Sequence, residues 1–334
     1  MDVRLSSEQK ALRDAVAQLV DRLGPESVAA LADVERHDKL EAAVAGAGWR
    51  ELRELDDDGA PYATAVEVAL VAEELSRGLA DVAFLGPVLA SELRRLADYP
   101  AAEQPETVVL TADLSRLATS GTDAIAIDSA GARSAVLLSG PGLPAYVNLT
   151  GPYPSPVDLT RATAGVEPDI AAPAVGRHRG GLDDDALTRW TAFGVAITSA
   201  ELLGVMRGAV DTTVAYAKTR KQYGTPIGSF QAVQHLLADA HVLVEGSRSL
   251  VQHAAWAVDA LEPAEALTAA ALAKAYTSRA ARTVCETSIQ VHGGIGNTWE
   301  CLAHVYLRRA FLSIDVLGGA NVHLRNVLTG FGVA

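Results

Sequence analysis

A stripe of apolar side chains near the C-terminal end constrains the fold of this chain most. From Val233 to Val258 these side chains recur every three or four residues, over about seven helical turns. So long a stripe requires other helices packed against it. Four further helices are expected: about Asp185 to Thr219, Pro263 to about His292, and two shorter ones that follow Asn297 and Gly319. Residues 181–334 are therefore predicted to form a C-terminal four-helix bundle.

Residues 1–104 are also predicted to be helical, as an N-terminal domain. Ser6 or Ser7 can cap a first helix that stops near Gly24-Pro25. Three more helices are expected: one that ends at Gly46 to Trp49, one from about Thr64 to Arg77, and one that follows Gly86-Pro87.

Residues 105–180 have a different pattern, which predicts a small β domain. Short β-leaning runs at 108–110, 124–127 and 135–138 are separated by Gly, Pro, Asp and Ser, as in an antiparallel sheet. The segment from Gly140 to Pro156 is rich in Pro and Gly, and few strands are expected. The predicted fold class is therefore multidomain α and β, with an N-terminal helical domain, a shortened β domain and a helical bundle.

Charge and cysteine content exclude several classes of protein. A net charge of −13 argues against nucleic-acid binding, although a local Arg or a helix N-terminus can still hold a phosphate. The first residues, MDVRLSSEQKALRDAV, lack the apolar core of a signal peptide, and no uninterrupted apolar stretch is long enough to span a membrane. Cys285 and Cys301 form no disulfide framework. We expect a cytoplasmic protein that binds neither nucleic acid nor a membrane.

Common catalytic and metal-binding templates are absent. His235 and His241 are six residues apart and so lie on different faces of a helix, which predicts no metal site. Gly294 and Gly296 resemble the start of a dinucleotide fingerprint, but position 299 is Trp and a helix precedes them, so the Rossmann interpretation fails.

Two segments at helix junctions stand out. The first, Arg220 to Gln231, reads R-K-Q-Y-G-T-P-I-G-S-F-Q and links two long helices through a tight turn. The second, Gln290 to Asn297, reads Q-V-H-G-G-I-G-N and ends one long helix. Taken singly, each is explained by ordinary helix ends: basic residues near the helix dipole, and a glycine C-cap. The functional alternative is backbone that approaches a ligand where side chains would clash.

The two segments together resemble the acyl-CoA dehydrogenase family. Three other stretches are also similar to that family: the opening S-S-E-Q-K-A-L-R-D, the turn from Gly46 to Trp49, and the helix from Ala72 to Arg77 with its E-E-L-x-R pattern. The resemblance covers the chain and implies the family's helix–β–helix order.

The resemblance implies a shared FAD site at a subunit interface. By resemblance, Arg220 reaches the pyrophosphate of an FAD held mainly by the neighbouring subunit, since a guanidinium meets phosphate oxygens bidentately. Gln222 and Tyr223 belong to the same motif, and Phe230 and Gln231 match positions near the adenosine. The remaining cofactor-binding positions implied by the family are Gln290, Gly293, Gly294 and Asn321.

The sequence departs from the family where the reaction takes place. The reaction needs a carboxylate to remove the α proton of an acyl-CoA, while flavin N5 takes the β hydride. The usual Glu position is Leu317 here, and an alternative base position on the preceding long helix falls near Gly194. Glu201 lies two turns beyond that position and Asp315 two residues before Leu317, so neither replaces the base.

The β domain departs from the family as well. The family's flavin-holding T-E-P-x-A-G-S is replaced by Thr111-Ala112-Asp113-Leu114-Ser115, and no W-I-[ST] strand follows. Because the flavin end looks degenerate and the adenosine end intact, the chain resembles the short subunit of actinobacterial α2β2 acyl-CoA dehydrogenases that act on steroid side-chain CoA esters.

These features predict a subunit with no catalytic residue of its own, which completes the FAD site of a Glu-bearing partner subunit. An acyl-CoA is the expected substrate, and an electron-transfer flavoprotein or similar protein the expected acceptor. Two alternatives stay open: a homo-oligomeric acyl-CoA dehydrogenase with an atypical base, and a flavin-free scaffold of the same fold.

Overall fold

The computed structural model describes residues 4–153, 157–167, 172–173 and 181–330. Its N-terminal helices are α1 (Ser7–Leu23), α2 (Val34–Gly46), α3 (Ala65–Arg77) and α4 (Leu85–Leu96), with a 3₁₀ turn at Ala29–Ala32. Ser6 caps α1 and Thr64 caps α3, each in a capping box with the residue three positions on. The predicted helical segments of this region are therefore confirmed, and the fourth begins one residue before the Gly86-Pro87 pair.

The strands form a small sheet of mixed direction. They are β1 (Glu106–Thr111), β2 (Ala124–Ile127), β3 (Ser134–Gly140), β4 (Leu143–Pro152), β5 (Thr163–Val166) and β6 (Ala172–Pro173), in the order β3-β1-β2-β5-β4-β6. The prediction of a purely antiparallel sheet is wrong, because β1 pairs with β3 in parallel. These two strands are not consecutive in the sequence, and no local sequence pattern predicts that they pair.

The longest strand, β4, runs through a segment that the sequence marks as rich in Pro and Gly. It pairs with β3 and, after a register shift between Leu149 and Gly151, with β5. Gly151 has a φ of 115°, which is accessible to glycine and rare for other residues. The glycine thus bends a continuous strand at an irregularity in the ladder.

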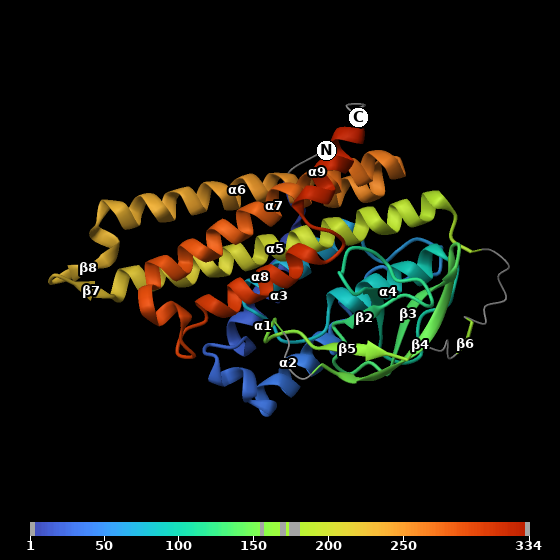
Figure 1. The fold of residues 1–334 in the computed structure, drawn as a ribbon, viewed down its shortest axis with the longest axis horizontal. Coiled ribbons are helices and arrows are strands. Elements are labelled where there is room, and N and C mark those ends of the chain that lie inside the picture. The colour runs from blue at the N-terminus through green and yellow to red at the C-terminus, as the bar shows by residue number, and fades with distance from the viewer. Residues whose placement is uncertain (1–3, 154–156, 168–171, 174–180, 331–334) are drawn as a thin grey trace.

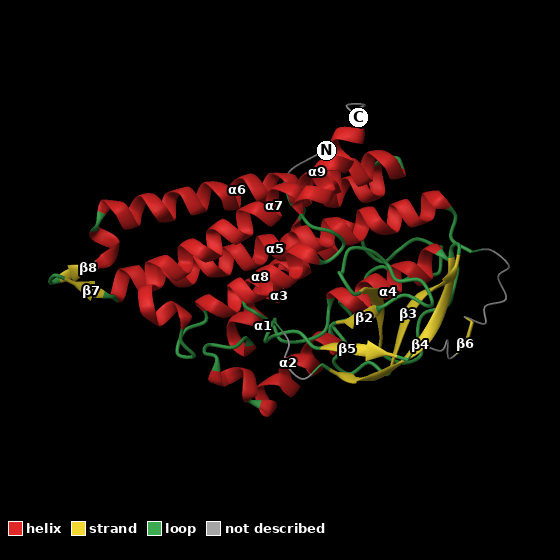
Figure 2. Ribbon diagram, viewed as in Figure 1, coloured by secondary structure: helices red, strands yellow, loops and turns green. Residues whose placement is uncertain are grey.

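Long helices form the C-terminal bundle. These are α5 (Asp184–Thr219), α6 (Gln231–Ala260) and α7 (Pro263–His292), followed by α8 (Ala303–Asp315) and α9 (Ala320–Gly330). By length and composition α5 could cross a membrane, but 89 % of its most apolar window is buried inside the protein, as in a core helix. A hairpin of two short strands, β7 (Lys221–Gln222) and β8 (Thr225–Pro226), follows α5. Figures 1 and 2 show the sheet at one end of the long axis and this hairpin at the other.

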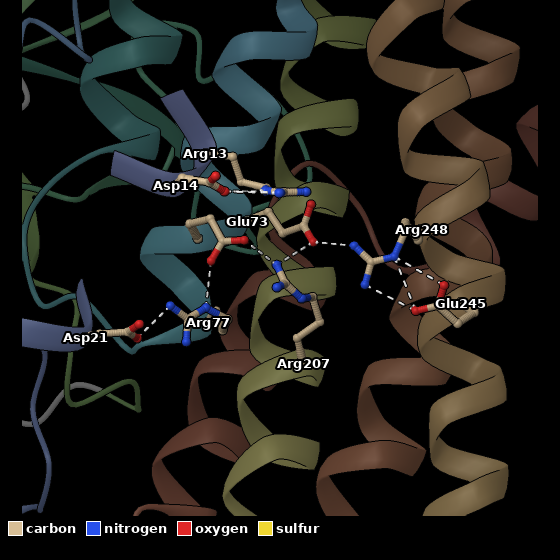
Figure 3. Close-up of polar contacts among 9 residues, drawn as sticks. Arg13, Asp14, Asp21, Glu73, Arg77, Arg207, Glu245 and Arg248 are labelled. Carbon is tan, nitrogen blue, oxygen red and sulfur yellow. Dashed lines mark hydrogen bonds and ion pairs between the residues drawn. The ribbon is translucent and has the colours of Figure 1, made fainter. Parts of the chain in front are cut away.

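Ion pairs bind the N-terminal helix α3 to the bundle (Figure 3). Arg207 of α5 donates to Glu73 at 2.7 Å and to Glu74 at 2.6 Å, and Arg248 of α6 donates to Glu73 at 2.9 Å. Arg77 donates to Glu74 at 2.6 Å. The E-E-L-x-R pattern thus holds three helices together.

One apolar core crosses the expected domain boundaries. It includes Val16 of α1, Val71 of α3, Val108 of β1 and Ile197 of α5. Along the chain, a group of helices is followed by the strands and then by a second group of helices. This is the predicted order, so the expected layout is confirmed. The boundaries between residues 104 and 105 and between 180 and 181 stay predictions, and residue 180 lies outside the described part of the chain.

Candidate cofactor site

The first motif forms a hairpin that extends beyond the bundle. Arg220 ends α5, and the strands β7 (Lys221–Gln222) and β8 (Thr225–Pro226) pair around Tyr223 and Gly224. Both turn residues have positive φ, and the side chain of Tyr223 is 94 % exposed. The guanidinium of Arg220 is exposed and makes no ion pair with the residues that the structure describes. The hairpin therefore presents its charge and its aromatic ring to a ligand or partner.

Two contacts bring the second motif to the same end of the bundle. The hydroxyls of Thr213 on α5 and Ser288 on α7 lie 2.7 Å apart. One turn further on, the rings of Tyr216 and His292 stack with centroids 4.4 Å apart. The C-terminal ends of α5 and α7 therefore lie side by side, although more than seventy residues separate them in sequence.

The glycines that follow His292 leave open backbone at this end. A methyl group added at Gly293 or at Gly294 would meet no described atom within 4 Å, and Gly293 has a φ of 67°. Gln290 is exposed in the last turn of α7, and Phe230 and Gln231 are exposed where α6 begins. The rings of Tyr223 and Phe230 lie edge to face at 6.4 Å.

We call this end of the bundle the open end. It gathers eight of the nine predicted cofactor-binding residues, all of them exposed: Arg220, Gln222, Tyr223, Phe230, Gln231, Gln290, Gly293 and Gly294. The permanently charged guanidinium of Arg220, the side-chain amides and the accessible glycine backbone are hydrogen-bond donors suited to a diphosphate and a nucleoside.

Asn321 does not belong to the open end of its own chain. It lies in the first turn of α9, which packs beside α7 near Lys274. From Lys274 to Gln290 the helix rises about 24 Å at 1.5 Å per residue. Figure 1 likewise separates α9 from the hairpin along the long axis. Any role of Asn321 therefore concerns a different part of a cofactor or a different copy.

The two positions that the resemblance assigns to the family's base lie next to each other in the interior. Leu317 is 3 % exposed, and a methyl group added at Gly194 would clash with its Cδ1 atom and lie 3.0 Å from Cδ2 of Leu89. The absence of a side chain at Gly194 thus makes room for Leu317. The two positions are adjacent in space and together form packed core.

The loop from Thr111 to Ser115, which the resemblance matches to T-E-P-x-A-G-S, lies against the same point. The backbone N–H of Leu317 donates to the carbonyl of Leu114 at 2.7 Å, and Leu114 is itself buried. Asp113 accepts from the Thr111 hydroxyl at 2.6 Å and from the Ser115 N–H at 3.1 Å, which holds the loop in a tight turn. We call this junction of Leu114, Gly194 and Leu317 the closed end.

Sequence reasoning missed two buried basic side chains that hold the Leu317 turn. Lys274 donates to the carbonyls of Ser313 at 2.5 Å and Val316 at 2.9 Å, and the His323 imidazole bonds the Leu317 carbonyl at 2.9 Å. Burial lowers the pKa of Lys274 to about 7 although Glu201 opposes the shift. Burial and then the charge of Lys274 lower the pKa of His323 to about 4. The sequence offered one signal for the first of these side chains, namely a lysine on the alanine-rich buried face of α7.

The two carboxylates considered as substitute bases are poorly placed. Glu201 is buried, and Arg309 donates to it at 2.8 Å while Arg161 pairs with it directly. Burial raises the pKa of Glu201, but Arg161 and Arg309 outweigh this and lower it. Asp315 is exposed at the end of α8. Glu201 is therefore a structural ion-pair partner.

A cavity of about 940 Å³ lies between the N-terminal helices and the β domain. Its lining includes Arg50, which pairs with Glu41 at 2.6 Å, and Arg94, which pairs with Glu106. None of the nine predicted cofactor-binding residues lines it. The cavity is separate from the candidate cofactor site.

Comparison with known proteins identifies the family. Residues 189–330 match the family model described as acyl-CoA dehydrogenase, C-terminal domain. Acyl-CoA dehydrogenase IpdE2 of Mycolicibacterium smegmatis is 31 % identical over 97 % of this chain and 98 % of that protein. IpdE2 of Mycobacterium tuberculosis is 32 % identical over 96 % of each. The chain therefore belongs to the acyl-CoA dehydrogenase family of oxidoreductases, as the motifs predicted.

Solved structures show the same fold. A variant of the Tcur3481–Tcur3483 steroid ACAD is similar with a TM-score of 0.81 and 23 % identity, over 97 % of this chain and 98 % of that one. The ChsE4–ChsE5 complex of Mycobacterium tuberculosis gives 0.79 and 23 % over the full length of both chains. PigA, solved with FAD and proline, gives 0.74 and 17 % over the full length of both. The predicted fold class is confirmed.

Proposed function

We propose that this chain is the half-site subunit of a heteromeric, FAD-dependent acyl-CoA dehydrogenase. The complex would remove hydrogens from the α and β carbons of an acyl-CoA thioester. One observation carries the proposal: the open end exposes its polar groups, whereas Leu114, Gly194 and Leu317 fill the closed end with their own packing. Such a chain can complete a site on another subunit, and it has no room to hold a flavin ring and a base at the closed end.

The residues at the open end fit one part of FAD. The planar fork of Arg220 can meet two phosphate oxygens and stays charged at any working pH. The backbone of Gly293 and Gly294 can approach the same group because no side chain intervenes. Phe230, Gln231 and Gln290 would contact the adenosine. When bound, FAD supplies the acceptor for the substrate hydride, and the partner subunit supplies the carboxylate base.

The surface of α6 supports a partner at the same end. The apolar stripe that predicts neighbouring helices is covered in the second half of α6, where Val251 and Val258 are buried. In the first half, Leu236 of the same stripe is 39 % exposed. A helical face of a partner subunit beside the hairpin would cover this side chain.

Two of the similar structures suggest the kind of partner and substrate. ChsE4–ChsE5 is a two-component complex, and Tcur3481–Tcur3483 is a steroid ACAD. By analogy we propose a Glu-bearing acyl-CoA dehydrogenase subunit as the partner and a bulky acyl-CoA, such as a steroid side-chain CoA ester, as the substrate. An electron-transfer flavoprotein or similar protein would accept the electrons. We propose the cytoplasm as the location, in keeping with two free cysteines.

Co-expression tests the half-site proposal. The chain is purified alone and together with an acyl-CoA dehydrogenase subunit that has the Glu and T-E-P-x-A-G-S. Flavin absorbance is measured against protein concentration. We expect little FAD on the chain alone and one FAD per heterodimer in the complex. One FAD per chain in the isolated protein overturns the proposal.

A further inference from the structure

The cavity of about 940 Å³ between the N-terminal helices and the β domain has the size of a small-molecule site. Its lining comes from α2, from the turns that follow α2, from α4, and from the loops next to β1 and β2. The proposed FAD site uses none of these residues. A ligand for the cavity must therefore be inferred from the chemistry of its own walls.

The positive charges in these walls are already neutralised. Each of the three arginines that line the cavity donates two hydrogen bonds to a single carboxylate. The pairs are Arg50 with Glu41, Arg94 with Glu106, and Arg95 with Glu92. Arg50 and Arg94 also donate from their third nitrogen to a backbone carbonyl. Neither lysine nor histidine is among the lining residues. An anionic ligand would therefore find no unpaired cation in this cavity.

Two lining carboxylates, in contrast, lack a counter-ion. Glu51 and Glu54 make no ion pair with the residues that the structure describes, and a turn joins them, in which the Glu54 N–H donates to the Glu51 carbonyl at 2.9 Å. Burial and the charge of Glu51 raise the pKa of Glu54, although the charge of Arg94 opposes this shift. Arg53, which lies between them in sequence, is buried and pairs with Glu92 at 3.1 Å. The nearest cations are thus committed elsewhere.

Much of the remaining wall is apolar. Leu55 directly follows the two carboxylates, lines the cavity and is 43 % exposed. Prolines and alanines contribute further apolar surface, among them Pro87, Pro100 and Ala83. Covering such surface with an apolar group is favourable, because it removes both from water. The cavity therefore combines an unneutralised negative charge with a surface suited to a hydrocarbon.

We infer that this cavity binds a small organic cation, in which an ammonium group is carried on an apolar body. The ammonium group pairs with Glu51 and Glu54, and the apolar body packs against Leu55. A bare metal ion would leave the apolar wall unused, and no group of three metal-ligating side chains occurs in the described part of the chain. A ligand with a diphosphate, such as an acyl-CoA or FAD, would be repelled by the two carboxylates. The site is therefore distinct in chemistry from the open end.

Calorimetric titration of the full chain with n-octylammonium tests the inference without FAD or a partner subunit. Octanoate, which has the same number of carbon atoms and the opposite charge, is the matched control ligand. We expect octylammonium to bind about tenfold more tightly than octanoate or better, since only the cation can form charge-assisted hydrogen bonds to the carboxylates. The double variant Glu51→Gln, Glu54→Gln should lose about tenfold or more in affinity for octylammonium. Asp57→Asn removes a charge from the same loop outside the lining and should bind like the parent.

Leu55→Ala separates the apolar contribution from the charge. It should weaken octylammonium binding several-fold and leave the preference for octylammonium over octanoate in place. Circular dichroism establishes that each variant is folded, and the comparison of the two ligands on the parent chain decides the matter even if a variant does not fold. Three results overturn the inference: no octylammonium binding at millimolar concentration, equal binding of octanoate, or unchanged binding in the folded double variant. None of these results bears on the half-site proposal.

Discussion

The open end and the closed end of this chain differ in what their side chains contact. At the open end, Arg220 and Gln290 face solvent, and two glycines leave their backbone accessible. At the closed end, Leu114, Gly194 and Leu317 contact one another. One chain thus exposes polar groups and backbone at one place and packs apolar side chains into its own core at another.

The packing of the closed end stabilises the conformation of the Leu317 turn. Leu317 has a φ of 58°, a left-handed conformation that costs about 1–2 kcal/mol for a residue with a Cβ. Full burial of a leucine side chain contributes about 1.5–3 kcal/mol, and the bond to Leu114 contributes about 0.5–1.5 kcal/mol. The gain exceeds the strain. The turn is therefore expected to stay closed when a partner binds elsewhere.

The largest expected effect distinguishes the proposed catalytic role of the partner subunit from the role of this chain. In the complex, replacing the partner's base Glu by Gln should lower turnover 10²–10⁴-fold, because that is the usual cost of losing a general base. Asp315→Asn in this chain should change the rate by no more than a few-fold, since Asp315 is exposed at the end of α8. Steady-state kinetics with FAD content measured in parallel decide the matter. Loss of turnover in Asp315→Asn with FAD retained would place the base in this chain.

Acid should weaken the closed end through His323. The pKa of His323 is lowered from 6.5 to about 4 in the folded chain, so between these values the unfolded chain binds a proton that the folded chain does not. Stability should therefore fall as the pH falls through this window, by about 3 kcal/mol in all. Denaturant unfolding of the parent and His323→Gln at several pH values measures the difference.

A matched histidine at the open end serves as the control for that experiment. His235 is exposed on α6, so His235→Gln should leave the pH dependence of the parent unchanged. If His323→Gln keeps the full acid sensitivity of the parent, His323 does not hold the closed turn in its neutral form.

Arg220→Ala should weaken FAD binding in the complex and leave the fold intact. A hydrogen bond to a charged group contributes about 1.5–3 kcal/mol, which corresponds to about one to two powers of ten in affinity. Lys218→Ala removes the same charge one half-turn earlier on α5 and should have little effect, because surface charge alone contributes little. Fluorescence titration of FAD measures both. Equal dissociation constants for the two variants would reduce Arg220 to a helix-end charge.

Local pattern was sufficient to predict the helices. The run from Pro263 to His292 is α7 with those bounds, and Ser6 caps α1 as its position suggested. The same logic failed for the parallel pairing of β1 with β3, because strands that are not adjacent in sequence leave no local signal. Contacts between segments that are distant in the sequence can be identified only when the fold is known.

The candidate site likewise has features that the sequence predicted and features that it did not. The motifs predicted which residues belong to the open end, and the family resemblance predicted their shared cofactor, which stays a prediction for this chain. Neither predicted that Leu317 bonds Leu114 or that Lys274 holds the same turn, since these residues come from distant segments.

The smallest expected effect is the coupling energy between positions 194 and 317, which tests the packing of the closed end directly. Gly194→Ala should destabilise the chain by about 1–3 kcal/mol, because the added methyl group overpacks a core already filled by Leu317 and Leu89. Leu317→Ala alone should cost about 2–5 kcal/mol through the cavity it leaves. If the two positions fill the same space, the double variant should cost clearly less than the sum of the two single variants. Denaturant unfolding of all four proteins gives this coupling energy, for which residues in contact typically show about 0.5–3 kcal/mol. Additive costs would mean that the side chains at positions 194 and 317 do not compete for the same space.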